Sequence, residues 1–249
     1  MPALTDLVDH IDTLLNARAF KDYCPNGLQV QGRGQVGRLI TGVTASQALI
    51  EGAIDAGADA ILVHHGYFWR GEDARVVGMK RQRLKLLLDH DVSLLAYHLP
   101  LDAHPELGNN AQLAKLLGLV SEGALREDGI GNTGHLPRPM AAAEFAQRIE
   151  HRLGRAPTWI EGGPEQIRRV AWCTGAAQGM IEQAVAQGMD AYISGEVSEQ
   201  TVHVAREAGI HYFAAGHHAT ERGGPQALGE YLGSTLAISH EFIDIENPI

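Results

Sequence analysis

The sequence predicts an α/β fold in which two pseudo-repeated α/β halves form one composite layered domain, with a small α+β insert between them. Short apolar runs alternate along the chain with longer stretches of helical period. The apolar runs are nearly continuous, which is typical of parallel strands buried on both faces of a sheet. The same order of runs returns after residue 168. We therefore expect a first half at 1–125, an insert at 126–168 and a second half at 169–249.

Strands and helices alternate in the first half from residue 38 onward. The predicted strands are RLITGVTAS (38–46), DAILVHH (59–65) and VSLLAYH (92–98). The predicted helices are QALIEGAIDAG (47–57), MKRQRLKLLLDH (79–90) and GNNAQLAKLLG (108–118). Gly57 is expected to end the first of these helices.

The second half repeats this order. Its predicted strands are RRVAWCTG (168–175), DAYISGE (190–196) and IHYFAAGHH (210–218), and its predicted helices are GMIEQAVAQG (179–188) and EQTVHVAREAG (199–209). The insert is rich in Gly and Pro and contains one clear helix at about 141–153.

Two stretches of the halves align without gaps. The first alignment pairs Gly57 with Gly188 and Asp59 with Asp190, and the second pairs His98 with His217 and Asp102 with Glu221. Any α/β protein can repeat a helix, a glycine and a strand. That explanation does not account for a His-x-x-x-acid pattern at the same place in both halves, so we favour a duplicated fold.

Composition and charge exclude several classes of protein. The chain has 249 residues, 45% of them hydrophobic and 20% charged, as in globular proteins. A net charge of -10 argues against binding to a nucleic-acid backbone. The two cysteines, with no CxxC spacing, support neither a disulfide framework nor a thiolate zinc site. No secretion signal or membrane span is recognisable, so we expect a cytoplasmic protein with no membrane partner.

Three predicted strands end in residues that can bind metal ions. They are His64 and His65, then His98 with Asp102, and finally His217 and His218 with Glu221. Ligands of open α/β sheets gather at the carboxyl ends of strands. Imidazole and carboxylate donors together suit Zn, Mn, Fe or Co. Because more than four candidates converge, we expect two divalent metal ions per chain that share a bridging carboxylate.

Adjacent strand residues normally point to opposite faces, so His64 and His65 need an explanation. Gly66 is expected to let the chain turn sharply, so that both side chains reach one cavity. The alternative is one core histidine and one surface histidine. We favour metal binding because two other strand ends carry matching residues.

Further candidates lie beside these ligands. Tyr67, Trp69 and Arg70 follow the histidine pair and are candidate substrate-binding residues, which would stack on a planar substrate and face its anionic group. The alternative is that these residues anchor a long loop or a subunit contact. Glu196 is a candidate general base, or else a salt-bridge partner or the acid of a helix N-terminus.

The sequence resembles a known family at five motifs. They are PNGLQV (25–30), LVHHGYFW (62–69), AYHLPLDAHPELGNN (96–110), SGEVSEQ (194–200) and AAGHHATERGG (214–224). These motifs are similar to those of the GTP cyclohydrolase I type 2 homologues, which are YbgI-like, Ngg-interacting-factor-three-like dinuclear metal proteins. The resemblance covers nearly the whole chain, apart from the insert.

The resemblance implies a ligand set and an assembly. The implied metal ligands are His64, His65, Asp102, His217 and Glu221, with Glu221 bridging. His65 and Asp102 would bind mainly one ion, and His64 and His217 the other. His98 would act beside the ligands, through water, as a catalytic group. The family further implies a homohexameric ring.

We therefore expect a hydrolase that uses its metal ions to cleave a small molecule. The expected substrate is a nucleotide or another phosphorylated heterocycle. The family name suggests GTP cyclohydrolase-like chemistry. The alternative is a non-catalytic, metal-dependent binding or assembly protein.

Overall fold

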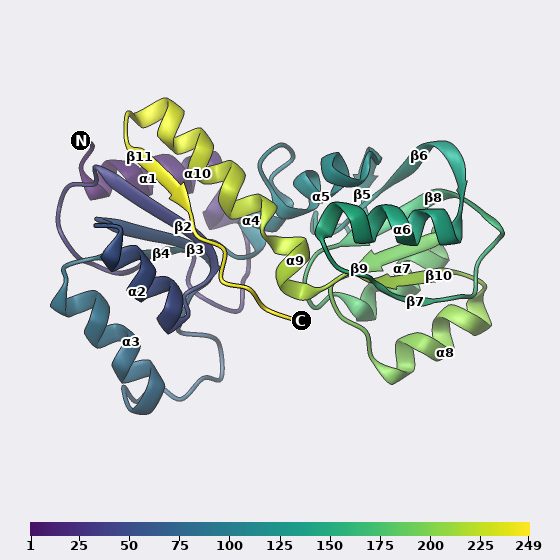
Figure 1. Cartoon of the computed structure of the whole chain (residues 1–249), viewed down its shortest axis with the longest axis horizontal. Helices are drawn as coiled ribbons and strands as arrows, with labels where there is room; N and C mark the ends of the chain where they lie inside the picture. The colour runs from purple at the N-terminus through teal and green to yellow at the C-terminus, as the bar shows by residue number, and fades with distance from the viewer. The chain divides into compact units, whose positions relative to one another are not determined.

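The computed structural model describes residues 1–249, which fold into two compact units. The first unit comprises residues 1–101 and 224–246, and the second comprises residues 102–223 and 247–249. The first unit is therefore built from two segments that are far apart in the sequence (Figure 1).

A five-stranded sheet forms the centre of the first unit, in the order β1-β4-β3-β2-β11. Its strands are β1 (Gly27–Val30), β2 (Arg38–Thr44), β3 (Ala60–His65), β4 (Ser93–Ala96) and β11 (Ser239–Phe242). Its helices are α1 (Leu4–Leu14), the short 3-10 helix η1 (Ala17–Ala19), α2 (Gln47–Asp55), α3 (Gly78–Asp89), the start of α4 (Leu99–Ala103) and most of α10 (Gly223–Leu236). Only β1 runs antiparallel to its neighbour.

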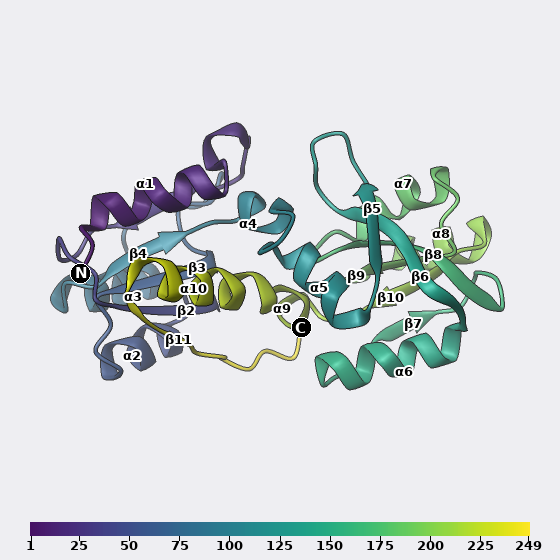
Figure 2. The same ribbon diagram turned by 90° about the horizontal axis from the view of Figure 1, so that it is seen from above.

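Helices cover both faces of this sheet, as the near-continuous apolar strands require. Ile61 and Val63 of β3 pack with α2 and α3 in one hydrophobic cluster. Figure 2 shows α1 on the opposite side of the sheet from α2. The strand order leaves the carboxyl ends of β3 and β4 next to each other, because the two strands are parallel neighbours.

A six-stranded sheet forms the centre of the second unit, in the order β5-β6-β8-β9-β10-β7. Its strands are β5 (Val120–Ala124), β6 (Asn132–Ala141), β7 (Thr158–Ile160), β8 (Gln166–Cys173), β9 (Ala191–Ser194) and β10 (His211–Ala214). Its helices are the end of α4, α5 (Asn109–Leu117), α6 (Ala142–Leu153), the 3-10 helix η2 (Gln178–Met180), α7 (Ile181–Ala186), α8 (Glu199–Ala208) and α9 (His217–Glu221). Phe145 and Ile149 of α6 pack on Trp172 and Phe213 of the sheet, while α8 lies on the other face (Figure 1).

The predicted repeat is confirmed at the level of individual residues. In each unit three consecutive strands, β2-β3-β4 or β8-β9-β10, run parallel, and a short strand pairs antiparallel with the third. Asp59 accepts hydrogen bonds from two successive backbone N–H groups at the start of β2, and Asp190 does the same early in β8. Gly57 and Gly188 both have positive φ, 72° and 67°. The α/β class and the two repeated halves were therefore predicted correctly.

The two compact units do not coincide with the segments 1–125, 126–168 and 169–249. After residue 223 the chain returns to the first unit, where β11 pairs in parallel with β2. The segment 126–168 contains the expected helix, α6, and its strands β6 and β7 are hydrogen-bonded into the second sheet. Pro137 and Pro139 lie where the pairing of β6 with β8 shifts register. Because proline is unusual inside a strand, the sequence did not predict this ten-residue strand.

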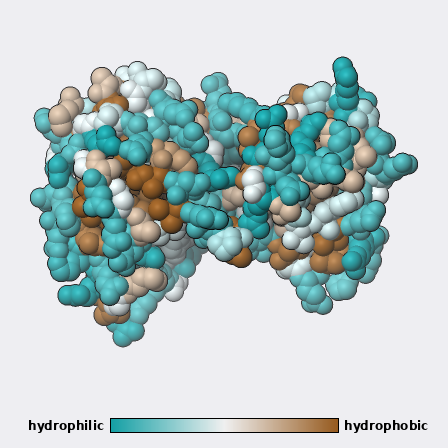
Figure 3. Space-filling model, in the orientation of Figure 1, coloured by the Kyte–Doolittle hydropathy of each residue, from teal (hydrophilic) through white to brown (hydrophobic).

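Hydrophilic side chains cover most of the face drawn in Figure 3, consistent with the net charge of -10. None of the helices combines the length and the apolar character needed to cross a membrane.

Candidate metal centre

Three histidines of the first unit gather at the carboxyl ends of β3 and β4. His64 and His65 are the last two residues of β3, and His98 follows β4. Their ring centroids lie 4.6 Å apart for His64 and His65, and 5.0 Å apart for His64 and His98. One ring nitrogen of each lies within 4.8 Å of one nitrogen of the other two. The adjacent histidines therefore do serve one cluster, which can bind a metal ion.

Gly66 contributes to this arrangement in a different way from the expected one. Its backbone is not in the left-handed region that only glycine adopts easily. Instead, a Cβ at this position would lie 2.6 Å from the Cβ of Ala96 on the neighbouring strand. Gly66 allows close packing of the strand ends, and a left-handed backbone is not part of its role.

The second unit carries a matching group of acids and one histidine. His217 and Glu221 are the first and last residues of α9, and Nε2 of His217 lies 3.2 Å from Oε2 of Glu221. A carboxylate oxygen of Asp102 lies within 4.8 Å of one of Glu221. Asp102 is itself held at Oδ1, which accepts hydrogen bonds from Asn109 (2.9 Å) and Thr174 (3.2 Å). Glu221 thus lies close to both Asp102 and His217.

Asp102 and Glu221 are almost completely buried, with 7% and 2% of their surface exposed. Buried carboxylates need compensating charge. Burial lowers the pKa of His217, but Glu221 and Glu196 outweigh that effect and raise the pKa to about 9. The position therefore favours positive charge, which a divalent cation also supplies.

Each of the four histidines at these two places has its Nδ1 hydrogen-bonded to an oxygen of the protein. The pairs are His64 with the carbonyl of Tyr97 (3.0 Å), His65 with the hydroxyl of Thr44 (3.1 Å), His98 with Asp22 (2.8 Å) and His217 with Glu196 (2.7 Å). Carbonyl and carboxylate oxygens only accept, so Nδ1 of His64, His98 and His217 carries a hydrogen. This pattern assigns metal binding to Nε2, the usual arrangement in metal sites.

The same Nδ1 pattern occurs at His90 and His135, whereas the buried His211 has the opposite one. Trp159 and the backbone N–H of Gly162 donate to its Nδ1, at 3.3 and 3.4 Å, and its Nε2 donates to the carbonyl of Pro164 at 2.9 Å. His211 is buried and has the opposite tautomer. It is a structural histidine, whereas the imidazoles of His64, His65 and His217, with the carboxylates of Asp102 and Glu221, fit divalent transition-metal ions.

Comparison with known proteins agrees with the sequence motifs. Residues 2–248 match the family described as Duf34/NIF3 (NGG1p interacting factor 3). The chain belongs to the Duf34/NIF3 family. It is 60% identical over 249 residues to a "GTP cyclohydrolase 1 type 2 homolog" of Pseudomonas aeruginosa, and the match covers 99% of this chain and 98% of that relative. The family predicted from the motifs is therefore confirmed.

Two solved structures share the whole fold. Protein ybgI, described as of unknown function, is 54% identical and superposes with a TM-score of 0.97 over 100% of both chains. TTHA1606 from Thermus thermophilus is 31% identical, with a TM-score of 0.92 over 100% of both chains. The two-sheet architecture is thus shared with both of these solved structures.

Within this Duf34/NIF3 chain, the three candidate substrate-binding residues have different surroundings. Trp69 lies beside the histidine cluster, with its ring centroid 5.0 Å from that of His98 and 6.0 Å from that of His65. Tyr67 is buried, and its hydroxyl donates to the carbonyl of Ala45. Arg70 donates to the carbonyl of Asp22. Only the tryptophan lies beside the cluster, while the other two hold the loop in place.

Glu196 is hydrogen-bonded to His217 and so orients a candidate ligand, a role that the sequence does not distinguish from that of a general base. Asp22 holds His98 in the same way, and no local pattern marks it, because the two residues are 76 positions apart. His218 contributes its backbone N–H to the carbonyl of Ile249.

Arg155 is a further residue that sequence reasoning missed. Its guanidinium packs on Gly216, the residue before His217, where a Cβ would lie 2.8 Å from Cζ of the arginine. Nη1 of Arg155 is buried and has no hydrogen-bond partner in the protein. A cation with an unused donor beside α9 is suited to an anionic group.

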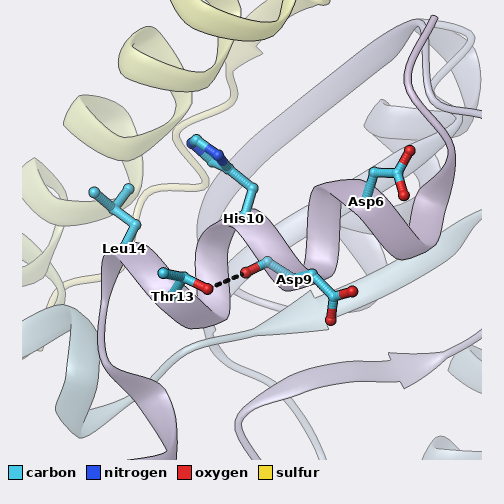
Figure 4. A pocket seen from close by; sticks show the side chains of 5 residues that line it. All are labelled: Asp6, Asp9, His10, Thr13 and Leu14. Atoms are coloured by element: carbon cyan, nitrogen blue, oxygen red, sulfur yellow. Dashed lines mark hydrogen bonds between the residues drawn. The ribbon is translucent and has the colours of Figure 1, made fainter.

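A separate hollow of about 570 Å³ lies along α1, lined by Asp6, Asp9, His10, Thr13 and Leu14 (Figure 4). Figure 4 shows His10 pointing toward α10, where its ring stacks on that of Tyr231, whereas Asp9 points away. The hydroxyl of Thr13 donates to the backbone carbonyl of Asp9. These side chains do not converge, so the hollow is not part of the metal-binding groups of this Duf34/NIF3 protein.

Proposed function

We propose that this Duf34/NIF3 protein is a metal-dependent hydrolase that holds two divalent ions per chain. The proposed ligands are His64, His65, Asp102, His217 and Glu221. The observation that carries the proposal is the clustering of imidazole and carboxylate donors, in which each ligand histidine has Nδ1 hydrogen-bonded to a protein oxygen and so leaves Nε2 for the metal. His90 and His135, outside these groups, also have Nδ1 hydrogen-bonded to a protein oxygen, so the orientation supports metal binding only together with the clustering of the donors.

The proposed substrate is a nucleotide or another phosphorylated heterocycle. Trp69, beside His65 and His98, offers an aromatic surface on which a planar base can stack. The relatives named "GTP cyclohydrolase 1 type 2 homolog" support the same class of substrate.

Divalent ions, when bound, supply Lewis acidity that lowers the pKa of water and polarises the substrate. The chain's own residues supply the remaining functions. His98 presents Nε2 as a hydrogen-bond acceptor, because Asp22 occupies its Nδ1. Glu196 keeps His217 oriented, and burial of Asp102 and Glu221 concentrates negative charge where cations bind.

Elemental analysis of the purified protein tests the proposal directly. We expect close to two transition-metal ions per chain in the wild type and a clear loss in His65→Ala, with hydrolysis of nucleotides and phosphoesters falling in parallel. The matched control is His203→Ala, because His203 is an exposed histidine on α8. A wild type that neither contains nor can be reloaded with metal would overturn the site. Metal without turnover of any substrate would instead favour a binding or assembly protein.

A further inference from the structure

Asp22 is a buried carboxylate in the loop before β1, and four donors surround it. Oδ1 accepts from Nδ1 of His98 (2.8 Å) and from the backbone N–H of Tyr23 (2.6 Å). Oδ2 accepts from the side-chain amide of Asn26 and the backbone N–H of Leu99, both at 2.9 Å. Only 2% of the side chain is exposed. Burial raises the pKa of Asp22, but these bonds outweigh it and lower the pKa to about 2, so the group is ionised.

The arrangement fixes His98 at two points. Its backbone N–H donates to Oδ1 of Asn26 at 2.7 Å, and its ring donates to Asp22. Asn26 in turn donates to Asp22, so the loop forms a closed set of hydrogen bonds around the histidine. An ionised carboxylate can only accept, so the hydrogen of the neutral ring is on Nδ1 and the lone pair on Nε2.

A third metal site is the competing explanation, because Asp22, Cys24 and His98 offer ligand atoms within 4.8 Å of one another. Two features speak against it. The oxygens of Asp22 already accept four hydrogen bonds. Burial, followed by the charge of Asp22, raises the pKa of the Cys24 thiol to about 12. A thiol that stays protonated is a poor metal ligand.

We propose that Asp22 is a positioning residue that holds His98 in the Nδ1–H tautomer, with Nε2 directed to the reacting water. The proposal rests on the proposed hydrolase function. His98 is well placed for it, because its ring lies 5.0 Å from that of His64 and 5.8 Å from that of His65. Carboxylate, imidazole and water in series form an acid–base relay, in which the carboxylate stays ionised and stabilises the protonated ring.

The relay balances atoms and charges. As the water oxygen forms its bond to the phosphorus or carbon centre, one O–H bond breaks and the proton moves to Nε2 of His98. The bond to the leaving group breaks with its electron pair, and the leaving atom then takes the proton from Nε2. Asp22 gains and loses nothing during the cycle, because its role is to orient the ring and to stabilise its transient positive charge.

Nitrogen-15 NMR of histidine-labelled, zinc-loaded protein tests the tautomer without any substrate. We expect His98, assigned by loss of its signal in His98→Gln, to show a protonated Nδ1 and a bare Nε2. His211 is an internal reference, since its hydrogen bonds require the opposite tautomer. In Asp22→Asn the Nδ1–H signal of His98 should weaken or move. A wild-type His98 with hydrogen on Nε2 would overturn the proposal, even if Asp22→Asn did not fold.

Kinetics of a double-mutant cycle test the relay, with GTP and bis(p-nitrophenyl) phosphate as probes. We expect Asp22→Asn to lower kcat roughly 100- to 10,000-fold, with metal content unchanged. If Asp22 acts through His98, adding Asp22→Asn to His98→Ala should cause little further loss. Independent, additive losses would instead indicate a merely structural role and contradict the proposal.

Asp12→Asn is the matched control, because Asp12 accepts a hydrogen bond from the hydroxyl of Tyr97 in the same region but does not touch His98. It should leave both the NMR signals and kcat close to wild type. If the wild type binds metal but turns over neither probe, the hydrolase proposal fails while the tautomer measurement still decides the role of Asp22.

Discussion

His217 is held on both sides of its ring, by Glu196 at Nδ1 and by Glu221 near Nε2. Glu196 lies outside the proposed ligand set, yet it fixes which nitrogen of the ring is available. Carboxylates that orient a ligating histidine in this way contribute to metal affinity, because they select the tautomer and raise the basicity of the ring. The contribution of Glu196 should therefore be measurable separately from that of the ligands.

We expect Glu196→Gln to weaken metal affinity by roughly 10- to 100-fold with the fold unchanged, because an amide orients the ring less firmly than a carboxylate. The measurement is competition with a chromogenic chelator. Glu199→Gln is the control, since Glu199 is an exposed acid at the start of α8. Equal affinities of the Glu196→Gln variant and the wild type would contradict the orienting role.

Asp22 links the stability of the first unit to pH. Its pKa is about 2 in the folded protein and 3.8 as the ordinary value, so its ionised form stabilises the fold above about pH 4. This contribution is lost as the pH falls from about 4 toward 2. The difference between the two pKa values corresponds to about 2 kcal/mol in the free energy of unfolding.

Asp22→Asn should accordingly lower the free energy of unfolding by about 2 kcal/mol near neutral pH, with the difference from wild type shrinking as the pH approaches about 3. Urea unfolding followed by circular dichroism across this pH range measures it. The pKa of Asp73 is lowered by Arg75, but Asp73 is fully exposed, so Asp73→Asn should change stability little at any pH. A pH-independent difference for Asp22→Asn would show that the carboxylate charge is not responsible.

At the scale of elements, Asp59 and Asp190 immediately precede equivalent strands, β3 and β9, in the two units. Each of them accepts hydrogen bonds from two successive backbone N–H groups, which for Asp190 are those of Arg168 and Arg169, at 2.9 and 2.7 Å. The carboxylate thus connects the start of one strand, β2 or β8, to the residue before the next strand, β3 or β9. This is a structural reason for the acid to recur in both halves.

Asp190→Ala should destabilise the second unit by about 1–3 kcal/mol, because two backbone donors lose their acceptor. Thermal or urea unfolding measures the loss, and hydrogen exchange at β8 and β9 should localise it. Glu207→Ala, an exposed acid late in α8, is the control and should remain within about 0.5 kcal/mol of wild type. Exchange that rises only in the first sheet would refute this assignment.

Sequence reasoning succeeded for elements whose signals are local. The apolar runs that end in His64 and His65, and the repeated acids Asp59 and Asp190, were recognisable from neighbouring residues alone. Asp22 was not, because only folding brings it to His98. Strand β11 is four residues long, SHEF, and its identity depends on pairing with β2 rather than on its own pattern.

At the scale of the whole molecule, we propose that six chains form a closed ring, as the family resemblance implies. The chain carries a net charge of -10, so chains in a ring repel one another. Polar and apolar contacts between neighbouring chains must offset this repulsion. The ring and the metal sites are separate properties if the ligands serve catalysis rather than assembly.

Removal of the metal with a chelator should therefore leave the mass of the assembly unchanged, and Glu221→Ala should form the same ring without metal. Native mass spectrometry and light scattering of wild type, chelated protein and Glu221→Ala measure this. Dissociation of the ring on chelation would favour a metal-dependent assembly protein. A monomeric wild type would exclude the ring itself.

The division of the sequence between the two units also sets the order in which their two sheets can be completed during synthesis. All six strands of the second unit lie between residues 120 and 214, in one continuous stretch. Strand β2 of the first unit leaves the ribosome early, but its neighbour β11 ends only at residue 242. Until then β2 presents an unpaired, largely apolar edge. The sheet that is begun first is completed last, so the nascent chain is most exposed to wrong strand pairing at β2.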